Sequence, residues 1–241
     1  NHFILVVLMK TLAHHHENSS DHGSLIEEII LGGQDGVVNV LGLVLGVAAA
    51  TTDARIVLIA GITVTFAESI SMAAVAYTSQ KAAKQYFESE KQREIMEIEQ
   101  FPDIEKKEIR EIFEKKGFTG KDLDKVVEII TSDKKVWLNV MMSDELHLGS
   151  YEEKDPKRAA VIVGIAAFFG SFFPIVPFFF TDTQTGMILS LIFSVGILFV
   201  AGVVKAKYTI GNWFKNGLEM AAIGAIAAIA GYIIGILLQG I

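Results

Sequence analysis

The sequence predicts an all-α membrane protein, a five-span transmembrane helix bundle with an inserted cytoplasmic helical domain, and we expect it to form a homodimer. The first observation is that three stretches of 22 residues contain no charged side chain. A helix needs about 20 apolar residues to cross the hydrocarbon core of a bilayer. Two further stretches contain a single charged residue between them, Glu68. The five predicted spans are residues 36–52, 56–80, 159–180, 183–204 and 220–241.

The second observation is the concentration of charge in one segment. Residues 81–158 hold 16 of the 21 Lys and Arg residues and 19 of the 28 Asp and Glu residues, which indicates a soluble domain between the second and third spans. We therefore expect a disordered N-terminal tail, two spans, a cytoplasmic helical metal-binding domain and three further spans. The predicted boundaries are 1–24, 25–80, 81–157 and 158–241.

Composition narrows the function classes. The mean hydropathy is +0.43, and the net charge of −7 gives no indication of nucleic-acid binding. Cysteine is absent, which excludes disulfides, thiolate metal sites and a cysteine nucleophile. Basic residues flank the inserted domain and the 205–215 loop, whereas the opposite span ends carry only Arg55. The positive-inside rule therefore places the N-terminus, the domain and that loop in the cytoplasm.

The inserted domain is predicted to contain four helices. The first, residues 81–100, continues the second span, and Pro102 with Asp103 provides a break and an N-cap for a helix over 104–116 that ends at Gly117. A third helix covers 122–130. Ser132 or Asp133 caps a fourth, which runs through Met141 and stops at Gly149.

Two carboxylates are predicted in or near the membrane. A charge at the centre of a membrane helix costs roughly 2.5–3.5 kcal/mol, and such residues usually mark an ion or proton pathway. Glu68 is in this position, and Asp35 begins the first span. Asn39 and Met72 each follow one helical turn later, on the same face. We predict a translocation path of Asp35, Asn39, Glu68 and Met72, although Asp35 could also be an interfacial residue and Met72 a packing residue.

Acidic clusters in the soluble domain predict a second cation site. Like charges one turn apart destabilise a helix by roughly 0.2–0.5 kcal/mol per pair, and nearby cations offset these pairs only in part. A thioether next to carboxylates favours a softer transition metal over Mg²⁺ or Ca²⁺. Met141 is interpreted either as a core residue beside Trp137 or as a ligand. The candidates are Glu94, Glu97, Glu105, Glu108, Met141, Met142 and Glu145, with Glu90 and His147 as weaker ones.

Other features leave alternatives open. GxxxG pairs occur at Gly32/Gly36, Gly42/Gly46 and Gly231/Gly235, and they fit either a homodimer or packing within one subunit. Pro174 and Pro177 are expected to end or kink the third span. Met9 is a plausible start, so residues 1–8 are expected not to be native. The tail could bind metal or be incidental; its histidines are His14, His15, His16 and His22.

Several short motifs, taken in order, resemble the vacuolar iron transporter family. They are Asp35-Gly36, ISM at residues 70–72, Pro102-Asp103, WLxxMMxxE at 137–145, DPKRA at 155–159 and PxxP at 174–177. The resemblance implies a dimer of five-span subunits that moves Fe²⁺, or in some members Mn²⁺, out of the cytosol in exchange for protons. It implies a cell membrane location in a prokaryote and a vacuolar one in a eukaryote.

The resemblance also assigns roles to residues. It implies that Asp35, Glu68 and Met72 line the path, and that the cytoplasmic candidates from Glu94 to Glu145 gather metal. This chain departs from the family at Val64, where many members have a carboxylate one turn before the position of Glu68. The carboxylate of the path is therefore expected to lie one turn closer to the cytoplasm here.

Three functions are compared. The leading one is export of Fe²⁺, or of Mn²⁺, Zn²⁺ or Co²⁺, as a bound and transported ion, with protons as counter-ion and no separate cofactor. The second is a metal-sensing membrane scaffold that binds metal without moving it, for which Glu68 would serve no purpose. The third, a di-iron membrane enzyme, ranks last because the chain has no Glu-x-x-His pair.

Overall fold

The computed structural model describes residues 2–148, 155–208 and 211–239, with side chains described from Gly23 onward. Regular structure in these ranges is helical without any strand, which confirms the predicted all-α class. The chain divides into two compact units, Asn1–Tyr77 with Lys157–Ile241, and Thr78–Pro156. The side chains of the tail histidines (His14, His15, His16 and His22) are not among the described side chains, and the expected helix stop at Gly149 lies outside the described residues.

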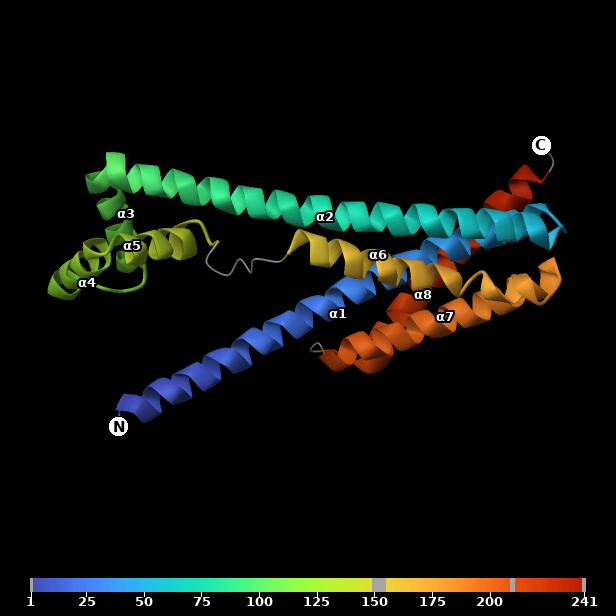
Figure 1. Ribbon diagram of the computed structural model, residues 1–241, viewed down its shortest axis with the longest axis horizontal. Coiled ribbons are helices and arrows are strands. Elements are labelled where there is room, and N and C mark those ends of the chain that lie inside the picture. The colour runs from blue at the N-terminus through green and yellow to red at the C-terminus, as the bar shows by residue number, and fades with distance from the viewer. Residues whose placement is uncertain (1, 149–154, 209–210, 240–241) are drawn as a thin grey trace. The chain divides into compact units, whose positions relative to one another are not determined.

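Most helices of the first unit are long (Figure 1). Within the described residues, four helices are long and apolar enough to cross a membrane: Gly23–Ala50 of α1, then α2, α7 and α8. The full bounds are α1 (His2–Ala50), α2 (Ala54–Gln100), α6 (Pro156–Phe172), the 3₁₀ helix η2 (Val176–Phe179), α7 (Thr183–Tyr208) and α8 (Trp213–Leu238). Helix α2 contributes its first part to this unit and, as predicted, continues unbroken to Gln100.

Helix α6 has 17 residues and ends at Phe172, within the predicted third span of residues 159–180. The prediction that Pro174 and Pro177 end or kink this segment is confirmed, since α6 ends at Phe172 and η2 follows. A helix break in an apolar environment leaves backbone groups that need partners. The buried Ser190 hydroxyl of α7 supplies one by donating a 2.7 Å hydrogen bond to the Pro174 carbonyl.

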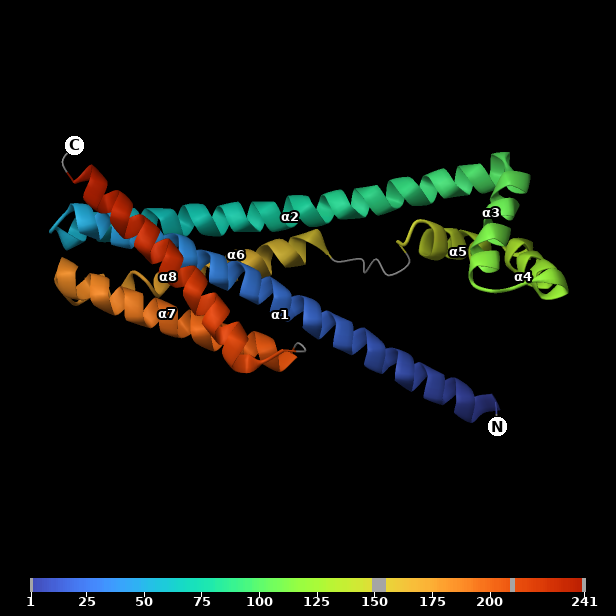
Figure 2. The same cartoon turned by 180° about the vertical axis from the view of Figure 1, so that it is seen from behind.

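Glycines let α1 approach its neighbours closely. A Cβ atom at Gly231 or Gly235 of α8 would overlap the carbonyl oxygen of Gly42 or Gly46 of α1, respectively. Figure 2 shows α8 lying across α1. These two GxxxG pairs therefore pack against each other within one subunit, the second of the two alternatives. The Gly32/Gly36 pair meets α6 in the same way, at the carbonyls of Val163 and Ala167.

The second unit is a small helical domain. It contains the end of α2, α3 (Pro102–Lys115), α4 (Gly120–Ser132), α5 (Lys134–Val140) and the π-helix η1 (Met141–Glu145). Its core comprises Ile98, Ile109, Leu123, Val127, Ile130, Trp137 and Met141.

Two of the predicted helix signals in this domain are confirmed and one is wrong. Gly117 has φ +96° and follows α3, and the Asp133 carboxylate caps α5 by accepting from the Lys135 amide at 2.8 Å. Asp103 is not the N-cap of α3, because the helix already begins at Pro102. Proline at a first helical position loses no hydrogen bond, since that amide would have no partner in the helix.

The contact between α1 and α8 can be tested with Gly231→Ala. The added methyl would collide with the Gly42 backbone, and such overpacking typically costs about 1–3 kcal/mol of stability. We expect a lower midpoint of thermal unfolding in detergent micelles. Gly196→Ala is the matched control, because a Cβ there has no neighbour within 4 Å. Equal melting of the two variants would contradict the close contact.

Candidate metal site

Three glutamates of the second unit converge. Glu94 lies on α2, Glu105 on α3 and Glu145 at the end of η1, and each offers a carboxylate oxygen within 4.8 Å of the others. Glu94 is 1% exposed and Glu105 is 4% exposed, whereas Glu145 closes the group on its exposed side. All three were predicted as ligands from the sequence, and the structure brings them together.

Local structure explains how residues so far apart in sequence meet. The break at Pro102 ends α2 and starts α3, so that Glu94 and Glu105 come from two successive helices. The π-helix carries Glu145 and bonds Leu146 N to Met141 O at 3.1 Å. Lys116, which follows α3, holds this segment through a 2.6 Å ion pair with Asp144. Single π turns are rare and are often found at functional sites.

Two of the buried oxygens are unsatisfied. Glu94 Oε2 and Glu105 Oε2 have no hydrogen-bond partner among the described residues. An unpaired charge in a buried position is costly, and it is normally neutralised by a proton, an ion pair or a metal. The arrangement therefore fits a cation with a preference for oxygen ligands.

The pKa values of the three carboxyl groups support the interpretation of the cluster as a cation site. Burial, together with the negative charges of Glu108 and Glu94, raises the pKa of the Glu105 carboxyl to about 7. Partial burial and the charges of the same two residues raise the pKa of Glu145 to about 7 as well. Burial raises the pKa of Glu94, although the hydrogen bond from Arg93 opposes this. Without a metal, the cluster is therefore expected to retain protons near neutral pH.

The other predicted ligands have different surroundings. Met141 is fully buried in the domain core with Trp137, and Met142 is 5% exposed. Glu97 and Glu108 lie outside the three-residue group, but their charges act on Glu105. His147 is exposed and has φ +55°.

Arg93 has a larger role than the sequence indicated. Its guanidinium contacts Glu90 at 2.9 Å, Glu94 at 3.4 Å and Glu97 at 3.5 Å, so one cation serves the whole glutamate stripe of α2. The sequence predicts only that cations near the acidic pairs offset them in part. The signal was present in the spacing, because Arg93 lies three residues after Glu90 and four before Glu97.

The predicted membrane residues also lie together in the first unit. Asn39 of α1 donates a 2.9 Å hydrogen bond from Nδ2 to Glu68 Oε1 of α2. The Asp35 carboxyl lies near both Glu68 and Asn39. Met72 is half-buried one turn after Glu68, and no described contact joins it to this group.

The structure explains why position 64 carries Val64 and not a carboxylate. Val64 packs against an apolar cluster that includes Val40 and Val44 of α1 and Ile175. A carboxylate would be poorly placed in these surroundings. The Thr65 and Ser69 hydroxyls donate to the backbone oxygens of Gly61 and Thr65 at 2.9 and 2.6 Å. The acidic chemistry of this helix pair therefore lies at Asp35 and Glu68.

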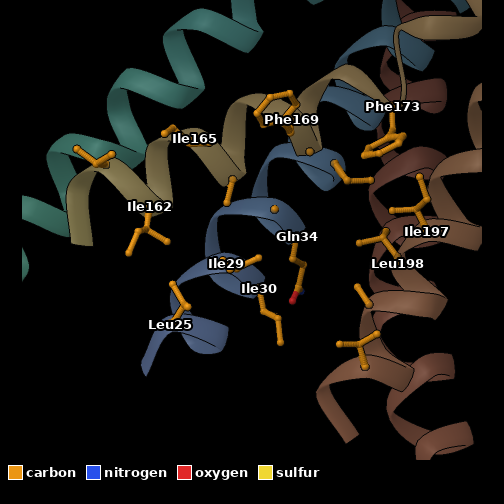
Figure 3. A pocket seen from close by; sticks show the side chains of 17 residues that line it. Leu25, Ile29, Ile30, Gln34, Ile162, Ile165, Phe169, Phe173, Ile197 and Leu198 are labelled. Atoms are coloured by element: carbon orange, nitrogen blue, oxygen red, sulfur yellow. The ribbon is translucent and has the colours of Figure 1, made fainter. Parts of the chain in front are cut away.

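An apolar cavity of about 580 Å³ lies between α1, α6 and α7 (Figure 3). Residues such as Ile29, Ile162, Phe169 and Leu198 line it, and the Gln34 amide is its main polar group. Neither Asp35 nor Glu68 is among its lining residues. It therefore offers no ligand set for a metal.

Comparisons with known proteins agree with this chemistry. The model of the VIT family matches residues 26–236. Vacuolar iron transporter 1 of Arabidopsis thaliana is 32% identical over 232 residues, covering 95% of this chain and 92% of that protein. Vacuolar iron transporter 1 of Oryza sativa subsp. japonica is 32% identical over 226 residues, covering 91% and 87%. The vacuolar iron transporter of Toxoplasma gondii is 34% identical over 235 residues, covering 93% and 77%.

The raised carboxyl pKa values predict how stability depends on pH. Glu105 and Glu145 have pKa values near 7 in the folded domain against an ordinary value of 4.5, so the folded state binds more protons between these values. Their contribution to stability is present below about pH 4.5 and is lost as the pH rises through about 7. We expect the metal-free domain to melt at a lower temperature at about pH 8 than at about pH 5.5.

The measurement uses Trp137 fluorescence in full-length protein carrying Trp213→Phe, since Trp137 lies in the domain core and the chain has two tryptophans. Glu105→Gln should reduce the pH dependence and raise the melting temperature at about pH 8. Glu128→Gln, an exposed position on α4, is the control. A wild-type melting temperature that increases over this pH range would contradict the assignment.

Proposed function

Since the chain belongs to the VIT family, we propose that it is a divalent metal transporter that moves Fe²⁺ out of the cytosol by proton antiport. Mn²⁺ is the second candidate ion. The observation that carries this proposal is the convergence of Glu94, Glu105 and Glu145, two of them buried with an unpartnered oxygen. Such a site binds a cation from the cytosol if the domain is cytoplasmic, as the distribution of basic residues indicates.

The first step is capture by the soluble domain. Carboxylate oxygens alone would suit a hard ion such as Mg²⁺, so selection of Fe²⁺ or Mn²⁺ needs a softer ligand. Met142 is the thioether we propose for this role, because it is buried in the same π-helix as Glu145 and is absent from the apolar core cluster. Met141 belongs to that core, and we assign it a structural role. Glu97 and Glu108 add negative charge around the captured ion.

The second step is transfer through the membrane at Asp35 and Glu68. Two carboxylates at the interface of α1 and α2 are neutralised by one divalent ion. When that ion leaves, proton uptake avoids two bare charges in a low-dielectric site. Metal and protons therefore compete for one site, which is the physical basis of antiport. The Asn39 amide orients Glu68 through its 2.9 Å hydrogen bond, and Met72 extends the path by one turn.

The proposal includes the wider arrangement expected from the sequence. Helix α6, its 3₁₀ continuation and the turns between them form a fifth span in addition to the four long helices. The subunits form a homodimer, for which the GxxxG contacts between α1 and α8 do not provide the interface because they are used within the chain. The membrane is vacuolar in a eukaryote and the cell membrane in a prokaryote.

A metal-sensing scaffold is the second candidate. One observation favours it: the three-glutamate site lies entirely within the second unit and needs no residue of the first. The hydrogen-bonded Asn39–Glu68 pair favours the transporter, because a sensor has no need of a polar pair between membrane helices.

The transport step is tested with Glu68→Gln. The variant removes one of the two negative charges that the divalent ion must neutralise, so we expect Fe²⁺ flux in proteoliposomes to fall to that of empty vesicles. Wild-type flux should rise with an imposed pH gradient that is acidic on the receiving side. Glu219→Gln, an exposed glutamate of α8, should transport normally. A wild-type Fe²⁺ flux that does not change with the pH gradient would contradict the antiport mechanism. A flux above that of empty vesicles would then indicate a uniporter, and a flux equal to theirs would indicate a scaffold.

The capture step is tested with Glu105→Gln in the same assay. Loss of one of three carboxylates should raise the Fe²⁺ concentration for half-maximal flux roughly tenfold, because affinity follows the charge count of the ligands. The maximal flux should change little, since Asp35 and Glu68 are intact. An unchanged concentration dependence would show that the soluble domain does not deliver the ion.

A further inference from the structure

Arg93 is a cation that lies directly beside Glu94, one of the three glutamates proposed to bind the metal. It is the residue before Glu94, and its guanidinium contacts that buried carboxylate at 3.4 Å through Oε1. The other oxygen of the same carboxylate, Oε2, is buried and has no partner among the described residues. Glu94 is therefore shared between a resident cation on one side and an unfilled position on the other.

The contacts of Arg93 differ from an ordinary surface pair. Arg110 and Asp124, for example, form an ion pair between side chains that are 42% and 63% exposed. Arg93 is 46% exposed, but it contacts Glu94, which is 1% exposed, and Glu90, which is 15% exposed. A charge beside a desolvated carboxylate is screened less than one beside an exposed carboxylate.

The charges around the site indicate how the contact between Arg93 and Glu94 affects metal binding. Six carboxylates act at or beside the site: Glu90, Glu94, Glu97, Glu105, Glu108 and Glu145. The charge of Arg93 acts on both Glu94 and Glu145. A divalent ion between Glu94, Glu105 and Glu145 would be repelled by this guanidinium and would compete with it for Glu94.

We propose that Arg93 is a built-in counter-ion of the capture site, which weakens metal binding and so sets the cytosolic metal concentration at which capture begins. This inference rests on the proposed function of the three glutamates as a capture site. Arg93 stabilises the metal-free carboxylates, and it yields Glu94 when a divalent ion enters. A monovalent cation, with half the charge, gains less from the site and does not displace the guanidinium as readily.

The opposite role would also be compatible with the distances. Arg93 could instead hold the carboxylates in position for the metal, and in that case its removal would weaken binding. The two roles therefore predict opposite signs for the same substitution. The sign of the change in affinity, and not its mere occurrence, decides between them.

The experiment measures Mn²⁺ binding to full-length protein in detergent micelles, by electron paramagnetic resonance of the free ion. Arg93→Gln keeps a polar side chain but removes the charge, and we expect roughly three- to tenfold tighter Mn²⁺ binding. Arg93→Lys keeps the charge and should bind close to wild type. Arg110→Gln is the matched control, because it removes the same charge from the exposed pair between α3 and α4 and should leave affinity unchanged.

A double-mutant cycle with Glu105→Gln assigns the effect to this site. Glu105→Gln alone should weaken binding, and Arg93→Gln should have a smaller effect in that background. Unchanged or weaker binding by Arg93→Gln, with wild-type binding sensitive to Glu105→Gln, would overturn the role of Arg93 and leave the capture site in place. Wild-type Mn²⁺ binding that Glu105→Gln does not affect would overturn the capture site itself, and with it this inference.

Discussion

A carboxylate oxygen that is buried without a partner needs a proton or a cation. Glu94 and Glu105 both meet this condition in the soluble domain, where each has an inaccessible oxygen that no donor reaches among the described residues. The cost of leaving such a group charged and bare is several kcal/mol, so the site must change its proton or cation content when its occupant changes. The same constraint applies in the membrane, where Asp35 and Glu68 lie close together in an apolar unit. The proposed metal capture and the proposed metal–proton exchange both follow from this constraint.

The packing of α1 determines where the membrane carboxylates lie. Gly36, directly after Asp35, meets the backbone of α6 so closely that a side chain would not fit, and a side chain at Gly170 of α6 would collide with the Gly33 carbonyl. Farther along the helix, Gly42 and Gly46 meet α8. Membrane helices have little hydrophobic driving force for association, so close contact of small residues stabilises the arrangement. Asp35 and Asn39 are thus presented from a helix that is fixed on two sides.

Much of this arrangement could be predicted from the sequence. Hydropathy located the long apolar helices, because the requirement for about 20 apolar residues is strict. The end of α3 at Gly117 and the N-cap of α5 at Asp133 could be predicted, because each depends only on residues a few positions apart in the sequence. Glu94 and Glu105 were predicted as candidate ligands because like charges recur at helical spacing without enough cations beside them.

Other features depend on distant contacts that sequence patterns do not record. The segment after Phe172 leaves the α-helix, and the hydroxyl that satisfies its backbone comes from Ser190, 16 residues after Pro174. The GxxxG motifs could not distinguish contact between subunits from contact within one, because both need the same small residues. The π-helix at Met141–Glu145 has no local signature. The interaction of Arg93 with the metal site could be predicted only in part, because its strength depends on the burial of Glu94, which only the folded domain shows.

The most direct test of the central claim is anomalous diffraction from crystals of the full-length protein soaked in Mn²⁺. The account predicts a manganese peak within bonding distance of the Glu94, Glu105 and Glu145 carboxylates, and the loss of that peak in Glu105→Gln crystals. Saturating Mn²⁺ that leaves this position empty, with the three carboxylates paired through protons instead, would contradict it.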